Sequence, residues 1–195
     1  MRHIKWLKTF LIIIFVLVIG GTGWAESKDE KFNPINITEV IKIENGINYI
    51  DLNGDGTKDM IVSGHRHNIT AHSFQIYSFY INDLLKFDKK TFKWQIVAIE
   101  DGEKESYLIV TNEGAECILK DIRLIRMKGD KEYYLVIAER LPTKTYIDKE
   151  FVMFKFYKLF KDELENRWIY KKIFESKSKK KYCDVNEAFA ELKRK

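Results

Sequence analysis

The sequence predicts a mainly β fold, either an antiparallel sandwich or an open barrel of about eight or nine strands, followed by a short C-terminal helix. From residue 47 to residue 174, short segments either alternate apolar with polar residues or are apolar throughout. Turn-like pieces such as Glu100-Asp101-Gly102 separate these segments. Strands that follow one another through short links form antiparallel sheets, and this favours a sandwich or an open barrel.

The start of the chain is predicted to be a secretory signal peptide covering residues 1–25. Basic residues near the N-terminus precede an unbroken apolar run from Phe10 to Ile19, and the small-x-small sequence Gly23-Trp24-Ala25 follows. This order is typical of a signal peptide cleaved after Ala25. An uncleaved anchor is the alternative, although the apolar run is short for a membrane span. We therefore expect an exported protein, with no membrane segment after cleavage.

Removing the predicted signal peptide lowers the net charge of the chain. The mature chain keeps 31 of its 34 Lys and Arg residues against 29 Asp and Glu, so its net charge falls from +5 to about +2. A charge this small gives no reason to expect a nucleic-acid partner. Residues 26–195 are enough for one domain with its own core. We expect a single exported β-rich domain that ends in a helix at residues 184–193.

Taken in order, the elements begin with a weak helix signal at residues 34–43, with Asn36 or Thr38 as its cap. Strands are then predicted at 47–52, 60–64, 73–81, 94–99, 107–111, 118–127, 133–139, 151–160 and 167–174. The strand at 73–81 has apolar groups on both faces, which favours a central position in its sheet. Ser176 to Lys181 is interpreted as a basic, solvated link. The last helix follows, with Asp184 as its N-cap.

The segment DLNGDGTKD, at residues 51–59, has the spacing of a calcium-binding loop. Asp51, Asn53, Asp55 and Asp59 place side-chain oxygens at its first, third, fifth and ninth positions, and Thr57 can add a backbone carbonyl. The twelfth position lacks the Glu of a helix–loop–helix site, and the flanks are predicted strands. The segment thus resembles the integrin-type FG-GAP calcium hairpins. We predict a structural calcium ion there; the alternative is a polar hairpin whose carboxylates cap the turn.

Cys117 and Cys183 are the only two cysteines. In an oxidising compartment an even pair is typical of a disulfide, and two buried free thiols are the alternative. Because Cys183 directly precedes the predicted last helix, the bridge would join that helix to the sheet that contains Cys117.

Motifs of known hydrolases are lacking in the sequence. His65, His67 and His72 do not complete a zinc set, so we interpret them as polar strand or surface residues. The Ser-x-x-Lys matches within residues 176–181 have no SDN or KTG partner. We therefore predict that the protein is not an enzyme and has no catalytic residues.

Four segments together carry a family resemblance: GINYIDLNGDGTKDMIVSG, NITAHSFQIYSFYI, ECILKDIRLIR and CDVNEAF. They are similar to the CarG-like carbapenem intrinsic-resistance proteins, which are small exported proteins of Gram-negative bacteria. The resemblance implies a periplasmic homodimer that protects its host from a carbapenem without hydrolysis, by sequestering the β-lactam or by shielding its target. Two alternatives stay open: a calcium-stabilised module that binds envelope polymer or a protein, and a secreted hydrolase with scattered carboxylates.

Overall fold

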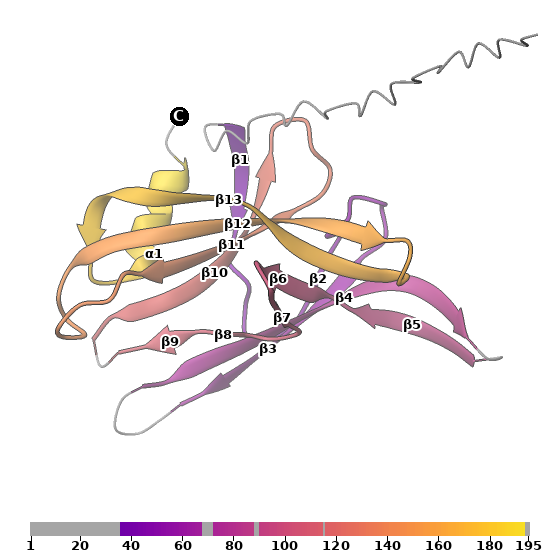
Figure 1. Ribbon diagram of the computed structural model, residues 1–195, viewed down its shortest axis with the longest axis horizontal. Coiled ribbons are helices and arrows are strands. Elements are labelled where there is room, and N and C mark those ends of the chain that lie inside the picture. The colour runs from indigo at the N-terminus through magenta and orange to yellow at the C-terminus, as the bar shows by residue number, and fades with distance from the viewer. Residues whose placement is uncertain (1–35, 68–71, 88–89, 115, 194–195) are drawn as a thin grey trace, which may run out of the picture. The chain divides into compact units, whose positions relative to one another are not determined.

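Two β-sheets and a short helical segment make up the described part of the chain (Figure 1). The computed structural model describes residues 36–67, 72–87, 90–114 and 116–193, without the side chains of residues 85–87 and 193. These residues lie within one compact unit, Phe32–Lys195. The predicted signal peptide and its cleavage site lie outside the described residues.

The large sheet contains eight strands, in the order β1-β10-β11-β12-β13-β6-β7, with β9 paired to β10. Its neighbours are antiparallel except β13 and β6, which run parallel. The strands are β1 (Ile37–Ile41), β6 (Ala98–Asp101), β7 (Lys104–Ser106), β9 (Asn112–Glu113), β10 (Ile118–Met127), β11 (Tyr134–Arg140), β12 (Glu150–Asp162) and β13 (Arg167–Tyr182).

The small sheet contains five strands, in the order β2-β3-β4-β5, with β8 paired to β4. They are β2 (Gly46–Ile50), β3 (Asp59–Arg66), β4 (Phe74–Phe87), β5 (Lys90–Ile96) and β8 (Ile109–Val110). After β13 come helix α1 (Val185–Ala188) and the 3-10 helix η2 (Phe189–Lys193). Within the described residues, no helix is long and apolar enough to cross a membrane.

The large sheet is buried on both faces. One face packs against the small sheet, where Ile61 and Phe79 meet Leu124 and Leu135 in a shared core. The other face packs against the C-terminal helical segment, and Phe154 and Phe189 belong to that second core. The result is a sandwich of two sheets with a helix on the outer face of one of them, and neither sheet closes into a barrel among the described strands.

The predicted fold class is confirmed, although the strands number thirteen in the described residues because several are very short. The predicted strand at 118–127 has the observed bounds of β10, and β4 lies between β3 and β5 as expected. Asp184 is the N-cap of α1, since its side chain accepts a hydrogen bond from the Asn186 backbone N–H.

Two predicted elements were wrong. Residues 37–41 form strand β1, because they pair with β10 and place Val40 and Ile41 against the two cores. A weak local helix preference loses to such pairing. The supposed link at 176–181 continues β13, which stays paired with β12 as far as Tyr182.

Candidate functional site

The loop between β2 and β3 is held closed by its own carboxylates. The two carboxylate oxygens of Asp51 accept hydrogen bonds from the backbone N–H groups of Gly54 (2.8 Å) and Gly56 (2.9 Å). The Asp55 carboxylate accepts from the Thr57 backbone N–H (2.6 Å) and from the Asn53 side-chain amide (2.9 Å). The predicted ligand residues 51, 53 and 55 therefore do lie in one tight turn.

Asp59 occupies a different environment from the rest of the loop. Its side chain is buried, and it accepts hydrogen bonds from the backbone N–H groups of Leu52 (2.7 Å) and Asn82 (2.9 Å). Burial raises the pKa of this carboxyl and the charge of Asp55 adds to the rise, whereas the two N–H donors oppose it. Asp59 thus ties the loop to strand β4.

Gly54 allows the loop to pack against the turn between β10 and β11. Its φ is +75°, and a Cβ there would lie 2.7 Å from the Cβ of Lys131 and 2.9 Å from the backbone nitrogen of Glu132. The backbone N–H of Tyr133 also donates to the carbonyl of Leu52, at 2.9 Å. The glycine of the calcium-type pattern therefore has a packing role as well as a turn-forming one.

The hydrogen bonds of Asp51, Asp55 and Asp59 hold the loop in its observed conformation. Among the described residues, no three His, Cys, Asp or Glu side chains are grouped closely enough to hold a metal ion. Asp59 is turned inward to two backbone amides, apart from the side chains of Asp51, Asn53 and Asp55. Calcium at this loop stays a prediction.

The predicted disulfide is present between Cys117 and Cys183, whose Cα atoms lie 5.6 Å apart. Cys117 directly precedes β10, and Cys183 lies between β13 and α1. The bridge joins the start of a central strand to the start of the C-terminal helix, as the sequence indicated. The carbonyl of Cys183 also accepts a hydrogen bond from Arg140, which lines a pocket.

Arg140, the last residue of β11, organises the segment beyond that strand. Its side chain is only 7% exposed. The guanidinium donates to the backbone carbonyls of Tyr146 (2.8 Å), Cys183 (3.2 Å) and Thr145 (3.5 Å), and to the hydroxyl of Thr143 (3.3 Å). This single side chain folds residues 141–146 back toward the disulfide.

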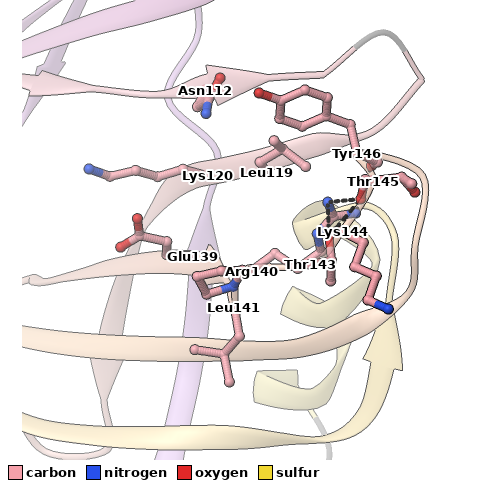
Figure 2. Close-up of a pocket in the computed structure, with 11 residues that line it drawn as sticks. Asn112, Leu119, Lys120, Glu139, Arg140, Leu141, Thr143, Lys144, Thr145 and Tyr146 are labelled. Atoms are coloured by element: carbon pink, nitrogen blue, oxygen red, sulfur yellow. Dashed lines mark hydrogen bonds between the residues drawn. The ribbon is translucent and has the colours of Figure 1, made fainter.

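The folded-back segment forms one wall of a pocket of about 340 Å³ (Figure 2). Figure 2 shows Lys120 of β10 and Glu139 of β11 side by side along one flank, while the Tyr146 ring extends over Leu119 toward Asn112. Three cationic residues line this pocket, Lys120, Arg140 and Lys144, and Glu139 is its one acidic residue.

A smaller cavity of about 150 Å³ adjoins the pocket, because Lys120 and Glu139 line both. In this second cavity the Asp101 carboxylate contacts the ammonium groups of Lys155 (2.8 Å) and Lys172 (2.6 Å). Lys155 and then Lys172 lower the pKa of Asp101 to about 2, so this carboxylate is ionised and paired at neutral pH.

The pocket residues were missed by the sequence analysis, because no motif joins positions that far apart. The sequence feature nearest to the pocket was the predicted disulfide at Cys183, whose carbonyl accepts a hydrogen bond from Arg140. The histidines are not assembled into a ligand set: the rings of His65 and His67 stack with centroids 6.2 Å apart, and His72 packs edge-on against Tyr146 at 5.3 Å. His72 is exposed.

Comparison with known proteins gives the family. A family model described as "Carbapenem resistance protein CarG-like" matches residues 43–191. The chain belongs to the CarG-like family. That match includes the loop at 51–59, both cysteines and all the residues that line the pocket.

A solved structure described as "Crystal structure of CarG" is similar to this CarG-like chain, with a TM-score of 0.61 and 23% sequence identity. The alignment covers 78% of this chain and 94% of that chain. At this level of identity the similarity shows a shared fold. No curated protein matches the sequence significantly. The family relates this chain to carbapenem resistance, and the chain shares its fold with CarG.

Proposed function

We propose that this CarG-like protein is exported to the periplasm and protects its host from a carbapenem without hydrolysing it, by sequestering the drug. The observation that carries the proposal is the family match over residues 43–191. Its non-enzymatic character is supported by the sequence, which lacks both the serine-hydrolase motifs and a zinc set. A cationic pocket of about 340 Å³ supports binding as the protective step, since small-molecule sites begin at roughly this size.

Survival of the host on a carbapenem tests this function. A strain that produces the protein is expected to survive drug concentrations that stop a deletion strain, and intact drug is expected to be recovered from the medium. Purified protein should leave the β-lactam absorbance unchanged. Rapid loss of that absorbance would contradict the proposal. Equal survival of the two strains, with strong retention on peptidoglycan, would instead support the envelope-binding alternative.

We also propose that the protein forms a homodimer through the outer face of the small sheet. Tyr49, Met60, Tyr80 and Ile96 are paired across neighbouring strands, so their side chains share one face, and Ile47 lies on it too. This is the face opposite the shared core. The exposed fractions of Ile47 and Tyr49 are 60% and 55%, on the edge strand β2. A contiguous apolar face of this kind marks an association surface, and a second copy would cover it symmetrically.

Replacing Ile47 by glutamate is expected to convert the dimer into a monomer, because the new charge would be buried in the interface. Sedimentation equilibrium of the mature protein at several concentrations measures the change. Leu164→Glu is the matched control: Leu164 is 98% exposed in the turn after β12, and its replacement should leave the dimer intact. A wild-type protein that is monomeric at all concentrations would contradict the proposal.

A structural calcium ion at the loop of residues 51–59 is the third element of the proposal. Calcium is expected to raise the melting temperature relative to EDTA, since an ion that binds only the folded state at a hundred times its Kd adds about 2.7 kcal/mol. Asp55→Ala is expected to abolish the difference. Asp55 suits this test because its side-chain hydrogen bonds stay within the exposed turn, whereas Asp59 is buried. Identical melting temperatures in calcium and in EDTA would show that the loop is a polar turn that binds no calcium.

A further inference from the structure

We propose that the pocket between residues 139–146 and the start of β10 is a binding site for a small organic carboxylate. A carbapenem belongs to this class, because its fused bicyclic nucleus carries one ring carboxylate. That choice of ligand rests on the proposed function. The charge and shape of the site are properties of the chain itself.

The first argument is the uncompensated charge of Arg140. Its guanidinium is buried, and its hydrogen-bond partners are all neutral: three backbone carbonyls, one hydroxyl and the Cys183 sulfur. A buried charge that no opposite charge neutralises favours an anion nearby. The N–H groups of Arg140 already donate hydrogen bonds to residues 143–146. We therefore infer that the positive charge of Arg140 attracts a ligand carboxylate through its electrostatic field, without direct contact.

The second argument is the presence of two more cationic residues in the lining of the pocket. Lys120 lies on the flank of the pocket, and the Lys144 side chain extends outward from its rim (Figure 2). Within the described part of the chain, neither ammonium has an ion-pair partner. Glu139 lies opposite Lys120 in the β10–β11 register and offsets one of the three positive charges. A ligand carboxylate would therefore meet a net positive site.

The third argument is that the walls are fixed before a ligand arrives. Arg140 holds the backbone of Thr145 and Tyr146, and the disulfide holds Cys183 beside it. On the other side, a Cβ added at Gly114 would lie 3.2 Å from the Cβ of Tyr146, so this segment also packs against Tyr146. The Tyr146 ring thus offers a positioned flat surface. A preformed site loses little entropy on binding.

Lys120 and Glu139 line both the pocket and the smaller cavity beside it, and this predicts how a ligand would lie. The main pocket of about 340 Å³ can take the bicyclic nucleus, and the adjoining cavity of about 150 Å³ lies where a side-chain substituent of the drug would extend. We therefore place the ligand carboxylate near Lys120, with its ring system against Tyr146.

Calorimetric titration of the mature protein tests the site. The probes are a carbapenem and its methyl ester, which keeps the rings and removes the negative charge. The carbapenem is expected to bind at least ten times more tightly than the ester. The double variant Lys120→Glu/Lys144→Glu is expected to bind the carbapenem at least ten times more weakly than wild type. Equal affinity for the drug and its ester, or undiminished binding by the double variant, would overturn the site.

Two further variants keep this test clear of folding effects. Lys128→Glu, an exposed lysine in the turn at the far end of β10, is the matched charge control and should bind like wild type. Lys144→Gln removes one exposed charge at the rim and should weaken binding several-fold with an unchanged melting temperature. Loss of binding in Lys128→Glu equal to that in the double variant would show a general charge effect and overturn the site.

The host experiment separates this inference from the proposed function. If the double variant is produced at the wild-type level and protects the host fully, with intact drug recovered, the site is wrong and the protective role stands. If the double variant loses both binding and protection while Lys128→Glu keeps both, the site is supported as the place where the drug is held.

Discussion

Replacing Asp121 by alanine is expected to lower the free energy of unfolding by about 3 to 5 kcal/mol, because it would leave a buried guanidinium without its carboxylate. The Arg123 Nη1 lies 2.6 Å from the Asp121 Oδ2, and the two side chains are only 9% and 7% exposed. The Asp121 carboxylate also accepts a hydrogen bond from the Ile122 backbone N–H, at 2.8 Å. Urea denaturation of the mature protein measures the change.

The same substitution is expected to loosen the C-terminal helical segment first. Arg123 donates a hydrogen bond to the Asn186 side chain in α1, and its guanidinium lies over the Phe189 ring, 4.5 Å from the centroid. Without Asp121, the Arg123 guanidinium, which joins the helix to the large sheet, is no longer held in position. Hydrogen exchange at the amides of residues 185–192 should therefore rise more than exchange in the small sheet.

Two controls distinguish an unpaired buried charge from general damage to the core. The double variant Asp121→Leu/Arg123→Met removes both charges and should be less destabilised than Asp121→Ala alone. Glu103→Ala changes an exposed acid in the β6–β7 turn and should stay within about 0.5 kcal/mol of wild type. A loss below about 1 kcal/mol for Asp121→Ala would show that water reaches Arg123 and compensates it.

Reducing the Cys117–Cys183 disulfide is expected to cost about 4 kcal/mol, because the bridge restricts the unfolded chain by closing a loop of 66 residues. The variant Cys117→Ser/Cys183→Ser should match the reduced wild-type protein. Reduction should also weaken carboxylate binding, since Cys183 positions the carbonyl that holds Arg140. Denaturation with and without reductant gives the first quantity, and calorimetric titration the second.

The serine variant needs no reductant, so it separates loss of the bridge from side effects of the reagent. Adding reductant to this variant should change neither its stability nor its binding. A reduced wild-type protein as stable as the oxidised one would mean that the unfolded chain is already compact around these residues.

Strands with strong local signals could be predicted from the sequence. Ile118–Met127 has the predicted bounds, and its apolar residues are buried on both faces of the large sheet. The N-cap at Asp184 was equally predictable, since a capping side chain bonds to a backbone group two residues away. Both signals depend on neighbours in the chain, and for that reason sequence reasoning detects them.

Elements that depend on distant partners were predicted poorly. Residues 37–41 carry a weak helix signal, yet pairing with β10 makes them a strand. Ser176 to Lys181 looks like a solvated link because it is rich in lysine. These lysines are carried on a strand: the ammonium of Lys177 lies over the Phe151 ring, 3.9 Å from the centroid, and Lys181 pairs with Glu150 at 3.0 Å.

The sequence by itself determined the class of fold, the pairing of the only two cysteines and the membership of residues 43–191 in the CarG-like family. Only the tertiary structure decided how the carboxylates of the 51–59 loop are used, with Asp59 turned inward to β4. It also brought Lys120, Arg140 and Tyr146 around one pocket. The reason is physical: cysteine pairing and strand periodicity follow from residue type and spacing, whereas a site of isolated side chains exists only after distant strands have paired.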